Sequence, residues 1–141
     1  MSSTDSKENI QRFVRNKGDI RISLKMLEEG IISDINIRDS SWYDGTALMY
    51  QAEHGTVESM ESLLAHKPHA LPNLQDSDGR TALHCAVYSG DDPAKVRLLL
   101  DYGADKTIRD NNGRTALDYA KTSNRTECIK LLENYTPQLR G

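Results

Sequence analysis

Apolar residues recur along the chain in short blocks that are separated by polar stretches. In the clearest block, Val96, Leu99 and Leu100 fall on one face of a helix because their spacing matches the helical period. Asp92 can cap the start of this helix, and Pro93 suits its first position, where no backbone N–H is needed. The pattern predicts a helix that begins at residue 93.

A shorter block precedes that helix. Thr81 can cap it through the side-chain hydroxyl, and the small residues Ala82 and Ala86 allow close packing against neighbouring helices. We expect Gly90 to end this first helix in the left-handed conformation, and Gly103 to close the second. Together the two blocks predict a helix-turn-helix unit.

The same unit recurs along the chain. Thr-Ala-Leu begins at Thr46, Thr81 and Thr115, at intervals of 35 and 34 residues. Segments 76–80 and 110–114 precede two of these starts with Asp-x-x-Gly turn chemistry, since glycine tolerates a positive φ. A period of this length indicates a repeat architecture, in which stacked units bury a core that no unit could bury alone.

The repeated residues resemble the ankyrin repeat. The resemblance covers residues from about 10 to 135, and it implies an all-α solenoid of stacked helix-turn-helix units joined by β-turn or hairpin loops. In the third unit the residues that match the family pattern are Asp76, Gly79, Thr81, Leu83, His84, Ala86, Gly90, Leu99, Leu100, Gly103, Ala104 and Asp105.

About four repeats are expected, and the first and last are atypical caps that present polar residues to water. In the last repeat, Asn124 replaces the first glycine and also tolerates the left-handed conformation. The expected division is a flexible N-terminus at 1–8, an ankyrin-repeat domain at 9–136 with repeats at about 9–38, 39–75, 76–109 and 110–136, and a C-terminal tail at 137–141.

Composition agrees with an elongated protein or with one built from small residues. Only 37% of the 141 residues are hydrophobic, with one Trp and one Phe, which is lean for a compact core. The net charge of −3 and the lack of a basic stripe argue against a nucleic-acid partner. No apolar run reaches 18 residues, so a membrane is not expected. Two cysteines favour free thiols in a reducing compartment. We expect a monomer in the cytoplasm or the nucleus.

The sequence offers little for catalysis. His84 lies in the repeat signature, where the resemblance implies that it holds the turn through hydrogen bonds. His66 and His69 are three residues apart, but no further ligands complete a metal site. No pair of carboxylates, phosphate loop or dinucleotide fingerprint is evident. We therefore expect no enzymatic activity, no metal and no cofactor.

The resemblance implies that a partner protein contacts the turn tips and the exposed face of the first helices, which form a concave surface. The residue types that dominate binding hot spots include Trp, Tyr and Arg. The candidate partner-binding residues are Trp42, Tyr43, Glu53, His54, Asp78, Arg80, Tyr88, Asn112, Arg114 and Thr122.

Alternatives exist for several candidates. Trp42 can instead fold back over the join between repeats 1 and 2, and the arginines can form surface ion pairs, Arg80 with Asp78 and Arg114 with Asp110. The additional residues around Trp42 and at Asp91 indicate either a binding surface or neutral variation in loops. Segment 39–79 has one lysine and seven carboxylates, a formal charge of −6, which favours a partner with a basic segment.

The leading functional hypothesis is a non-catalytic adaptor or regulator that binds a protein. The alternative is an ankyrin module of a larger multidomain protein, such as a kinase, an acyltransferase or a ubiquitin ligase.

Overall fold

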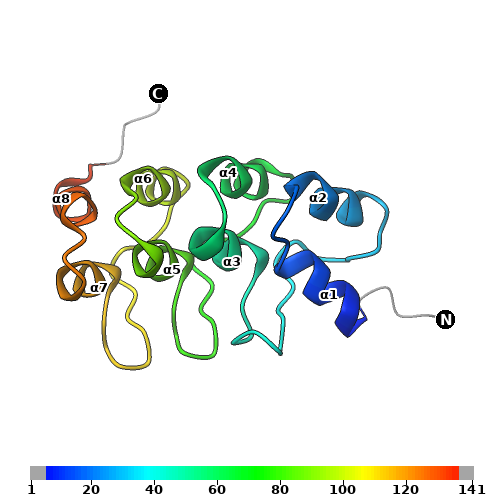
Figure 1. Ribbon diagram of the computed structural model, residues 1–141, viewed down its shortest axis with the longest axis horizontal. Helices are drawn as coiled ribbons and strands as arrows, with labels where there is room; N and C mark the ends of the chain where they lie inside the picture. Colours follow the sequence, from blue (N-terminus) through cyan, green and yellow to red (C-terminus); the bar gives the residue numbers. More distant parts are fainter. Residues whose placement is uncertain (1–5, 137–141) are drawn as a thin grey trace.

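The chain folds as a row of helix pairs. The computed structural model describes residues 6–136, and this range contains eight helices and no strands (Figure 1). The all-α class predicted from the sequence is confirmed. The helices are α1 (Lys7–Val14), α2 (Ile20–Glu28), α3 (Ala47–His54), α4 (Val57–Ala65), α5 (Ala82–Ser89), α6 (Pro93–Asp101), α7 (Ala116–Thr122) and α8 (Thr126–Asn134).

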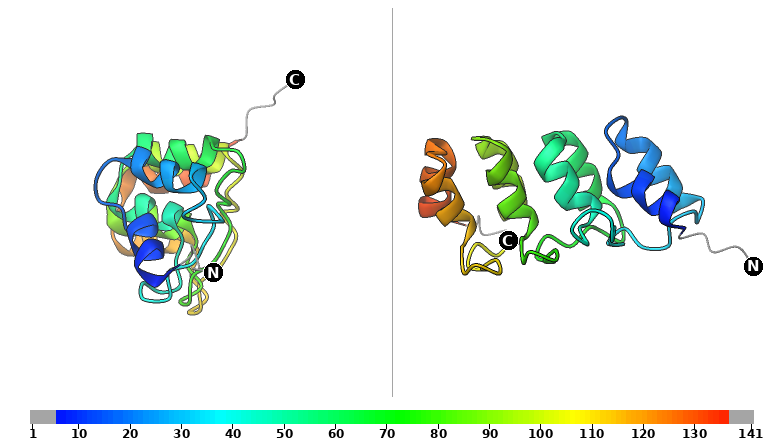
Figure 2. Two further views of the ribbon diagram at one scale, coloured as in Figure 1. Left: turned by 90° about the vertical axis from the view of Figure 1, so that its right-hand side faces the viewer. Right: turned by 60° about the horizontal axis from the view of Figure 1, so that its bottom comes forward.

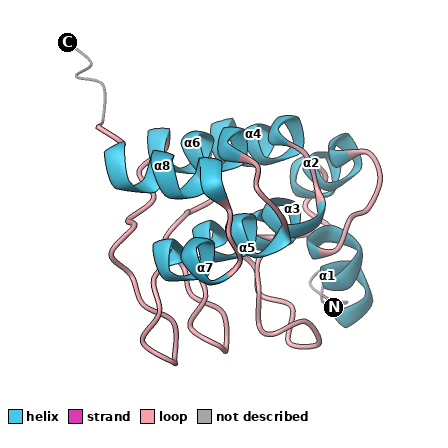
Figure 3. Cartoon of the chain, turned by 60° about the vertical axis from the view of Figure 1, so that its left-hand side comes forward, coloured by secondary structure: helices cyan, strands magenta, loops and turns pink. Residues whose placement is uncertain are grey.

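The helices form two layers. Helices α1, α3, α5 and α7 make an inner layer, and α2, α4, α6 and α8 make an outer layer (Figures 1 and 2). The loops between successive pairs extend past the inner layer on one side (Figure 3). One helix pair falls within each expected repeat, although α1 begins at Lys7, two residues ahead of the expected start at residue 9.

The repeated threonines occupy equivalent places in the stacked units. Thr46, Thr81 and Thr115 cap α3, α5 and α7, and each hydroxyl accepts a hydrogen bond from the backbone N–H three residues later, at 3.2–3.5 Å. This bond satisfies one of the amides that a helix start leaves without an intrahelical partner. The caps predicted from the sequence are confirmed.

Most of the predicted helix boundaries are confirmed, with one error. Asp92 caps α6, Pro93 lies at its first position, and Gly103 has a φ of 95°. Asn124 has a φ of 54°, as expected of a residue that replaces glycine. The left-handed conformation expected at Gly90 is wrong, because its φ of 169° is extended backbone that any residue adopts. The chain leaves α5 in an extended path instead of coiling back.

One apolar core runs along the row. Alanines 82, 86, 116 and 120 of the inner layer are at most 1% exposed, so their small side chains let neighbouring helices approach closely. The outer layer contributes larger side chains to the same core, and these are Met26, Met60, Leu63, Leu64, Val96, Leu99, Leu100 and Leu132. The core is therefore shared between repeats, as stacking requires.

The loop tips are hydrogen-bonded to one another. The backbone N–H of Ser77 donates to the carbonyl of Tyr43 at 2.7 Å, and that of Asn111 donates to the carbonyl of Asp78 at 2.9 Å. The Asn111 side chain adds a bond to the Ser77 carbonyl at 2.8 Å. These bonds fix the spacing of successive tips.

The additional residue at Asp91 has a structural role. Its carboxylate accepts hydrogen bonds from the backbone amides of Glu127 (3.1 Å) and Cys128 (2.9 Å) in the first turn of α8. Arg125, which precedes α8, makes no side-chain cap and instead donates to carbonyls at the end of α5, at 3.1 and 3.3 Å. Repeats 3 and 4 therefore each satisfy a helix end of the other.

Candidate functional site

The predicted binding residues lie on one side of the molecule. We define the groove face as the tips of loops 39–45, 76–80 and 110–114 together with the exposed sides of α3, α5 and α7. Glu53, Tyr88 and Thr122 occupy equivalent positions on it, each seven residues after the capping threonine of its repeat. The groove face thus presents a different side chain at the same place in each repeat.

A cleft opens on the groove face between α5 and α7. It has a volume of about 230 Å³, and its walls come from repeats 3 and 4. Four of the ten candidates meet there, together with Tyr119 and Ser123; the full lining is Arg80, Tyr88, Arg114, Tyr119, Thr122 and Ser123. Tyr88 is 60% exposed, so its ring forms an accessible wall of the cleft.

The backbone of Arg114 is firmly held, whereas its side chain is exposed. The carboxylate of Asp110 accepts the Arg114 N–H at 2.9 Å, and the Arg114 carbonyl accepts a hydrogen bond from the ring of His84 at 2.8 Å. Within residues 6–136 the guanidinium makes no hydrogen bond and no ion pair, and the predicted alternative of a pair with Asp110 is not formed, because that carboxylate binds the Tyr119 hydroxyl and backbone amides instead. Arg114 therefore brings an available charge to the cleft.

His84 has the structural role that the resemblance implied. The backbone N–H of Thr81 donates to Nδ1 at 3.1 Å, so the proton of the neutral ring lies on Nε2, which donates to the Arg114 carbonyl. Burial lowers the pKa of His84 and outweighs the opposing effect of that hydrogen bond and of Asp110 and Asp76. The neutral ring joins repeat 3 to the turn of repeat 4.

Tyr119 is a lining residue that the sequence analysis did not select. Its hydroxyl donates to the carboxylate of Asp110, and burial together with this bond raises the pKa of Tyr119. Its ring lies edge-on to His84 at 4.9 Å between centroids. The sequence could have drawn attention to Tyr119 because it is an aromatic residue in the first helix of repeat 4. However, it lies four residues after the capping threonine, and the equivalent residue of repeat 3, Cys85, is buried.

Arg80 is held by carboxylates. Its Nη2 lies 2.9 Å from Oδ2 of Asp76, and its Nη1 lies 3.7 Å from Oε1 of Glu53. The predicted alternative of a pair with Asp78 is wrong, because the turn directs Asp78 to solvent while Asp76 folds across the turn to Arg80. Only 12% of the Arg80 side chain is exposed, and the guanidinium lies 4.9 Å from the ring centroid of Tyr43. Arg80 is a wall of the cleft.

Aromatic residues cluster over α3. The ring of Trp42 lies edge-on to Tyr50 at 5.1 Å, and Tyr50 lies 4.7 Å from the ring of His54. The indole also lies against Gly45, where an added Cβ would come within 2.5 Å of it. Trp42 is half-buried, so it does fold back, and the packing it makes is onto α3. Tyr43 beside it is 53% exposed.

The remaining candidates lie apart from the cleft. Asp78 and Asn112 are exposed at the tips of neighbouring loops, and His54 is exposed and lies 2.9 Å from Glu53. Much of the acidic charge of segment 39–79 is compensated, since Asp39 pairs with Arg15 at 3.0 Å and is buried. The carboxylates that stay exposed are those of Asp44 and Asp78 at the tips and those of Glu58 and Glu61 on α4 in the outer layer.

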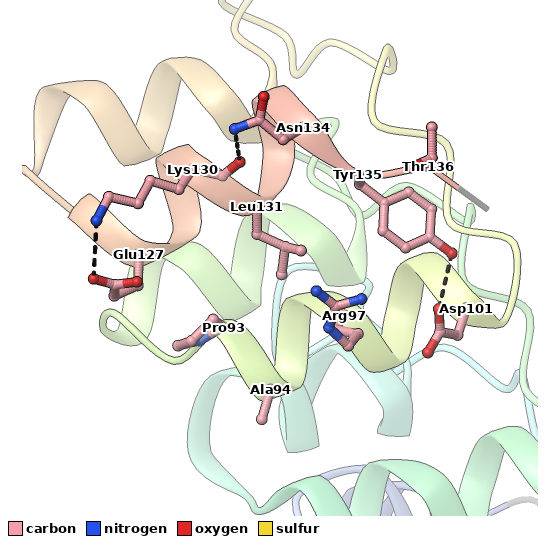
Figure 4. Close-up of a pocket in the computed structure, with 10 residues that line it drawn as sticks. All are labelled: Pro93, Ala94, Arg97, Asp101, Glu127, Lys130, Leu131, Asn134, Tyr135 and Thr136. Atoms are coloured by element: carbon pink, nitrogen blue, oxygen red, sulfur yellow. Dashed lines mark hydrogen bonds and ion pairs between the residues drawn. The ribbon is translucent and has the colours of Figure 1, made fainter. Parts of the chain in front are cut away.

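A larger hollow of about 810 Å³ lies in the outer layer between α6 and α8 (Figure 4). Three of its four charged side chains have partners within the hollow: Asp101 accepts a hydrogen bond from the Tyr135 hydroxyl at 2.8 Å, and Lys130 lies 3.6 Å from Glu127. Arg97 is exposed on its floor beside Leu131. No candidate from the sequence analysis lies in this hollow.

The described residues hold no group of three His, Cys, Asp or Glu side chains that could bind a metal ion. Burial raises the pKa of the free thiols Cys85 and Cys128 to about 12, so both are protonated at neutral pH. Between residues 6 and 136, no helix is long and apolar enough to cross a membrane.

Comparisons with known proteins agree with this geometry. The family model for ankyrin repeats (3 copies) matches residues 10–110 and 48–139. The chain is 35% identical over 134 residues to ankyrin repeat and SAM domain-containing protein 6 of Rattus norvegicus, which covers 89% of this chain and 15% of that protein. It is 33% identical over 107 residues to the ADP-ribosylation factor GTPase-activating protein AGD2 of Arabidopsis thaliana, covering 71% of this chain and 14% of that protein.

A solved structure shows the same architecture. The crystal structure of EF0377, an ankyrin repeat protein, superposes with a TM-score of 0.76 at 33% identity, and the match covers 94% of this chain and 65% of EF0377. The chain thus spans a small part of the curated relatives and most of a solved repeat array. With four capped helix pairs and a family match over more than half its length, the chain belongs to the ankyrin-repeat family.

Proposed function

We propose that this chain is a non-catalytic adaptor or regulatory module that binds a partner protein through the groove face. Ankyrin repeats indicate a protein-interaction module, and the observation that carries the finer proposal is the cleft between α5 and α7. There an exposed tyrosine meets an arginine whose guanidinium has no partner among residues 6–136, although the two come from different repeats. Both residue types are enriched at binding hot spots.

The other loop tips extend the proposed surface. Tyr43, Asp78 and Asn112 are exposed, and the hydrogen bonds between tips hold them in place before a partner arrives. Loops that are already ordered lose less conformational entropy when a partner binds. The exposed carboxylates of Asp44 and Asp78 support the proposal that a basic residue of the partner lies against the loop tips of repeats 2 and 3.

The proposed setting is the cytoplasm or the nucleus, and the proposed form is a monomer that binds neither nucleic acid nor membrane. The free, buried cysteines support a reducing compartment. The negative net charge supports the exclusion of nucleic acid.

A second candidate function is that of an ankyrin module within a larger protein, such as a kinase, an acyltransferase or a ubiquitin ligase. This candidate is favoured because the chain corresponds to only 14–15% of the length of the two curated proteins described above. In that case the groove face would recruit a substrate or a regulator for the remaining domains.

Affinity capture from a cell lysate, followed by direct binding of purified candidates, tests the proposal. The bait is the full chain in three forms: wild type, a groove variant with Tyr88→Ala and Thr122→Ala, and an outer-layer control with Arg97→Ala and Lys130→Ala. We expect a partner that binds wild type and control with equal affinity. Its affinity for the groove variant should be lower by roughly tenfold or more.

Hydrogen exchange of the complex then locates the contact. Protection should appear in α5, α7 and the loop tips. A partner that binds the groove variant as tightly as wild type, or that is lost only with the outer-layer control, would place the interface elsewhere and contradict the proposal.

A further inference from the structure

We infer that the cleft between α5 and α7 is a subsite for a carboxylate side chain, so that the partner segment carries an Asp or Glu next to an apolar residue. This inference rests on the proposed function, because it names the chemistry that the groove face selects. Two equivalent arginines in adjacent repeats, Arg80 and Arg114, have different partners.

Arg80 and Arg114 occupy the same position, directly before the capping threonine of repeats 3 and 4. Arg80 binds two carboxylates of this chain. One is Asp76 of its own turn, and the other is Glu53 at the exposed end of α3 in the preceding repeat. The fold therefore already places a carboxylate against this guanidinium between repeats 2 and 3.

Between repeats 3 and 4 neither carboxylate is available to the arginine: one is replaced by an uncharged residue, and the other binds different groups. The position of Glu53 is taken by Tyr88, which has no charge. The position of Asp76 is taken by Asp110, but one of its oxygens accepts the hydroxyl of Tyr119 and the other accepts two backbone amides. Arg114 consequently lacks the two partners that its equivalent has.

The replacement at Tyr119 explains why Asp110 does not reach Arg114. The equivalent residue in repeat 3 is Cys85, which is buried and leaves the second oxygen of Asp76 to Arg80. In repeat 4 the tyrosine hydroxyl occupies that oxygen. A carboxylate supplied by a partner would thus take the place that Glu53 takes beside Arg80.

The cleft has the remaining features of a carboxylate site. Its lining contains no acidic side chain, and Thr122 and Ser123, which carry hydroxyls, line the same space of about 230 Å³ as Arg114. A guanidinium can bind a carboxylate through two parallel hydrogen bonds, and these are stronger than bonds between neutral groups. The exposed ring of Tyr88 offers an apolar wall for the residue beside the acid.

A random library of 12-residue peptides displayed on phage, selected against the full chain, provides the probe. We expect enrichment of peptides that have Asp or Glu beside an aromatic or aliphatic residue. Synthetic copies of the enriched peptides should lose roughly tenfold or more in affinity for Arg114→Ala, as expected when a charge-assisted bond is lost. The matched control Arg97→Ala removes an exposed arginine of the outer layer and should bind like wild type.

Two further changes test the contact itself. Replacing the acid of the peptide with its amide should weaken binding to wild type but hardly change binding to Arg114→Ala, because the contact is already lost there. The variant Tyr88→Glu restores the arrangement of repeat 2, and its carboxylate should occupy Arg114 and exclude acidic peptides.

The outcomes separate this inference from the proposed function. Enriched peptides that lack an acid, yet are lost with Tyr88→Ala, would overturn the carboxylate subsite and leave groove-face binding intact. Acidic peptides that bind Arg114→Ala as tightly as wild type would also overturn it. Peptides that respond only to Arg97→Ala, or a selection that enriches nothing, would count against both.

Discussion

The residue before the capping threonine has a different environment in each of three repeats. In repeat 2 it is Gly45, and the absence of a side chain makes room for the indole of Trp42. In repeat 3 it is Arg80, which carboxylates of two repeats hold in place. In repeat 4 it is Arg114, whose charge is available. Differences at one repeated position can therefore set where a partner binds.

Trp42 and Tyr88 should respond differently to truncation. Trp42→Ala removes a half-buried ring from Tyr50, and we expect a loss of roughly 1–3 kcal/mol in the free energy of unfolding, less than for a fully buried aromatic. Tyr88→Ala removes an exposed ring and should change stability by about 0.5 kcal/mol or less. Urea unfolding measures both, and a Tyr88→Ala variant as unstable as Trp42→Ala would contradict this assignment.

His84 should make stability depend on pH. Because the folded pKa is lowered, its contribution is fully present above the unfolded pKa of about 6.5 and is lost as the pH falls through the lower folded pKa. Charging the buried ring would also remove the Thr81 N–H bond to Nδ1. We expect the free energy of unfolding to fall on acidification below pH 6.5.

The variant His84→Gln is the control for that measurement. It keeps a side chain that can hydrogen-bond but does not titrate, and so the pH dependence in this range should become flatter. The other three histidines, His54, His66 and His69, stay in place and report any contribution of their own. An unchanged pH profile in His84→Gln would show that another group is responsible.

At the scale of the element, helix ends explain the departures from the regular repeat. Three inner helices are capped by their own threonines, while α8 takes its cap from Asp91 of the preceding repeat. These hydrogen bonds from backbone amides lower the pKa of Asp91, and the bond from Cys128 has the largest effect. The loop residue that looked like either a binding feature or neutral variation is a part of the junction.

Asp91→Ala should lower the melting temperature at neutral pH, because two amides of α8 lose their acceptor and the helix start frays. The difference from wild type should shrink in strong acid, where the carboxylate is protonated. Thermal unfolding followed by circular dichroism checks both. Glu61→Ala, at an exposed carboxylate on α4, is the matched control and should melt like wild type.

The sequence predicted those elements whose causes are local. The threonine caps, Pro93, Gly103 and Asn124 act within a few residues of their position, and they are found where the pattern placed them. The left-handed conformation predicted for Gly90 was wrong, because glycine permits a left-handed helix cap without requiring one.

The site was harder to predict because its chemistry crosses repeats. Among the residues that the structure describes, Arg80 is bound by carboxylates and Arg114 is not. This difference depends on Glu53 and Tyr88 in the preceding repeats, and on the hydrogen bond from Tyr119 to Asp110. Such pairings become visible only when the repeats are stacked. The list of exposed positions could be carried over from the family pattern, but the partner of each charge could not.

At the scale of the whole molecule, the shared core should make the repeats unfold together. The single Trp42 reports on repeat 2, while circular dichroism reports on all helices from α1 to α8. We expect a helical spectrum and coincident transitions for the two signals in urea. Separate transitions would show that the row divides into independent parts, and a strand-dominated spectrum would contradict the fold.

The borrowed cap of α8 also limits how such a chain can be recombined. A chimera that joins a foreign third repeat to this fourth repeat at residue 110 would omit Asp91 and leave the last helix without its acceptor. The same exchange made before Asp91 would carry the acid along. The segment that must be exchanged as one piece therefore begins inside repeat 3 at Asp91, ahead of the boundary at residue 110 that the repeat pattern marks.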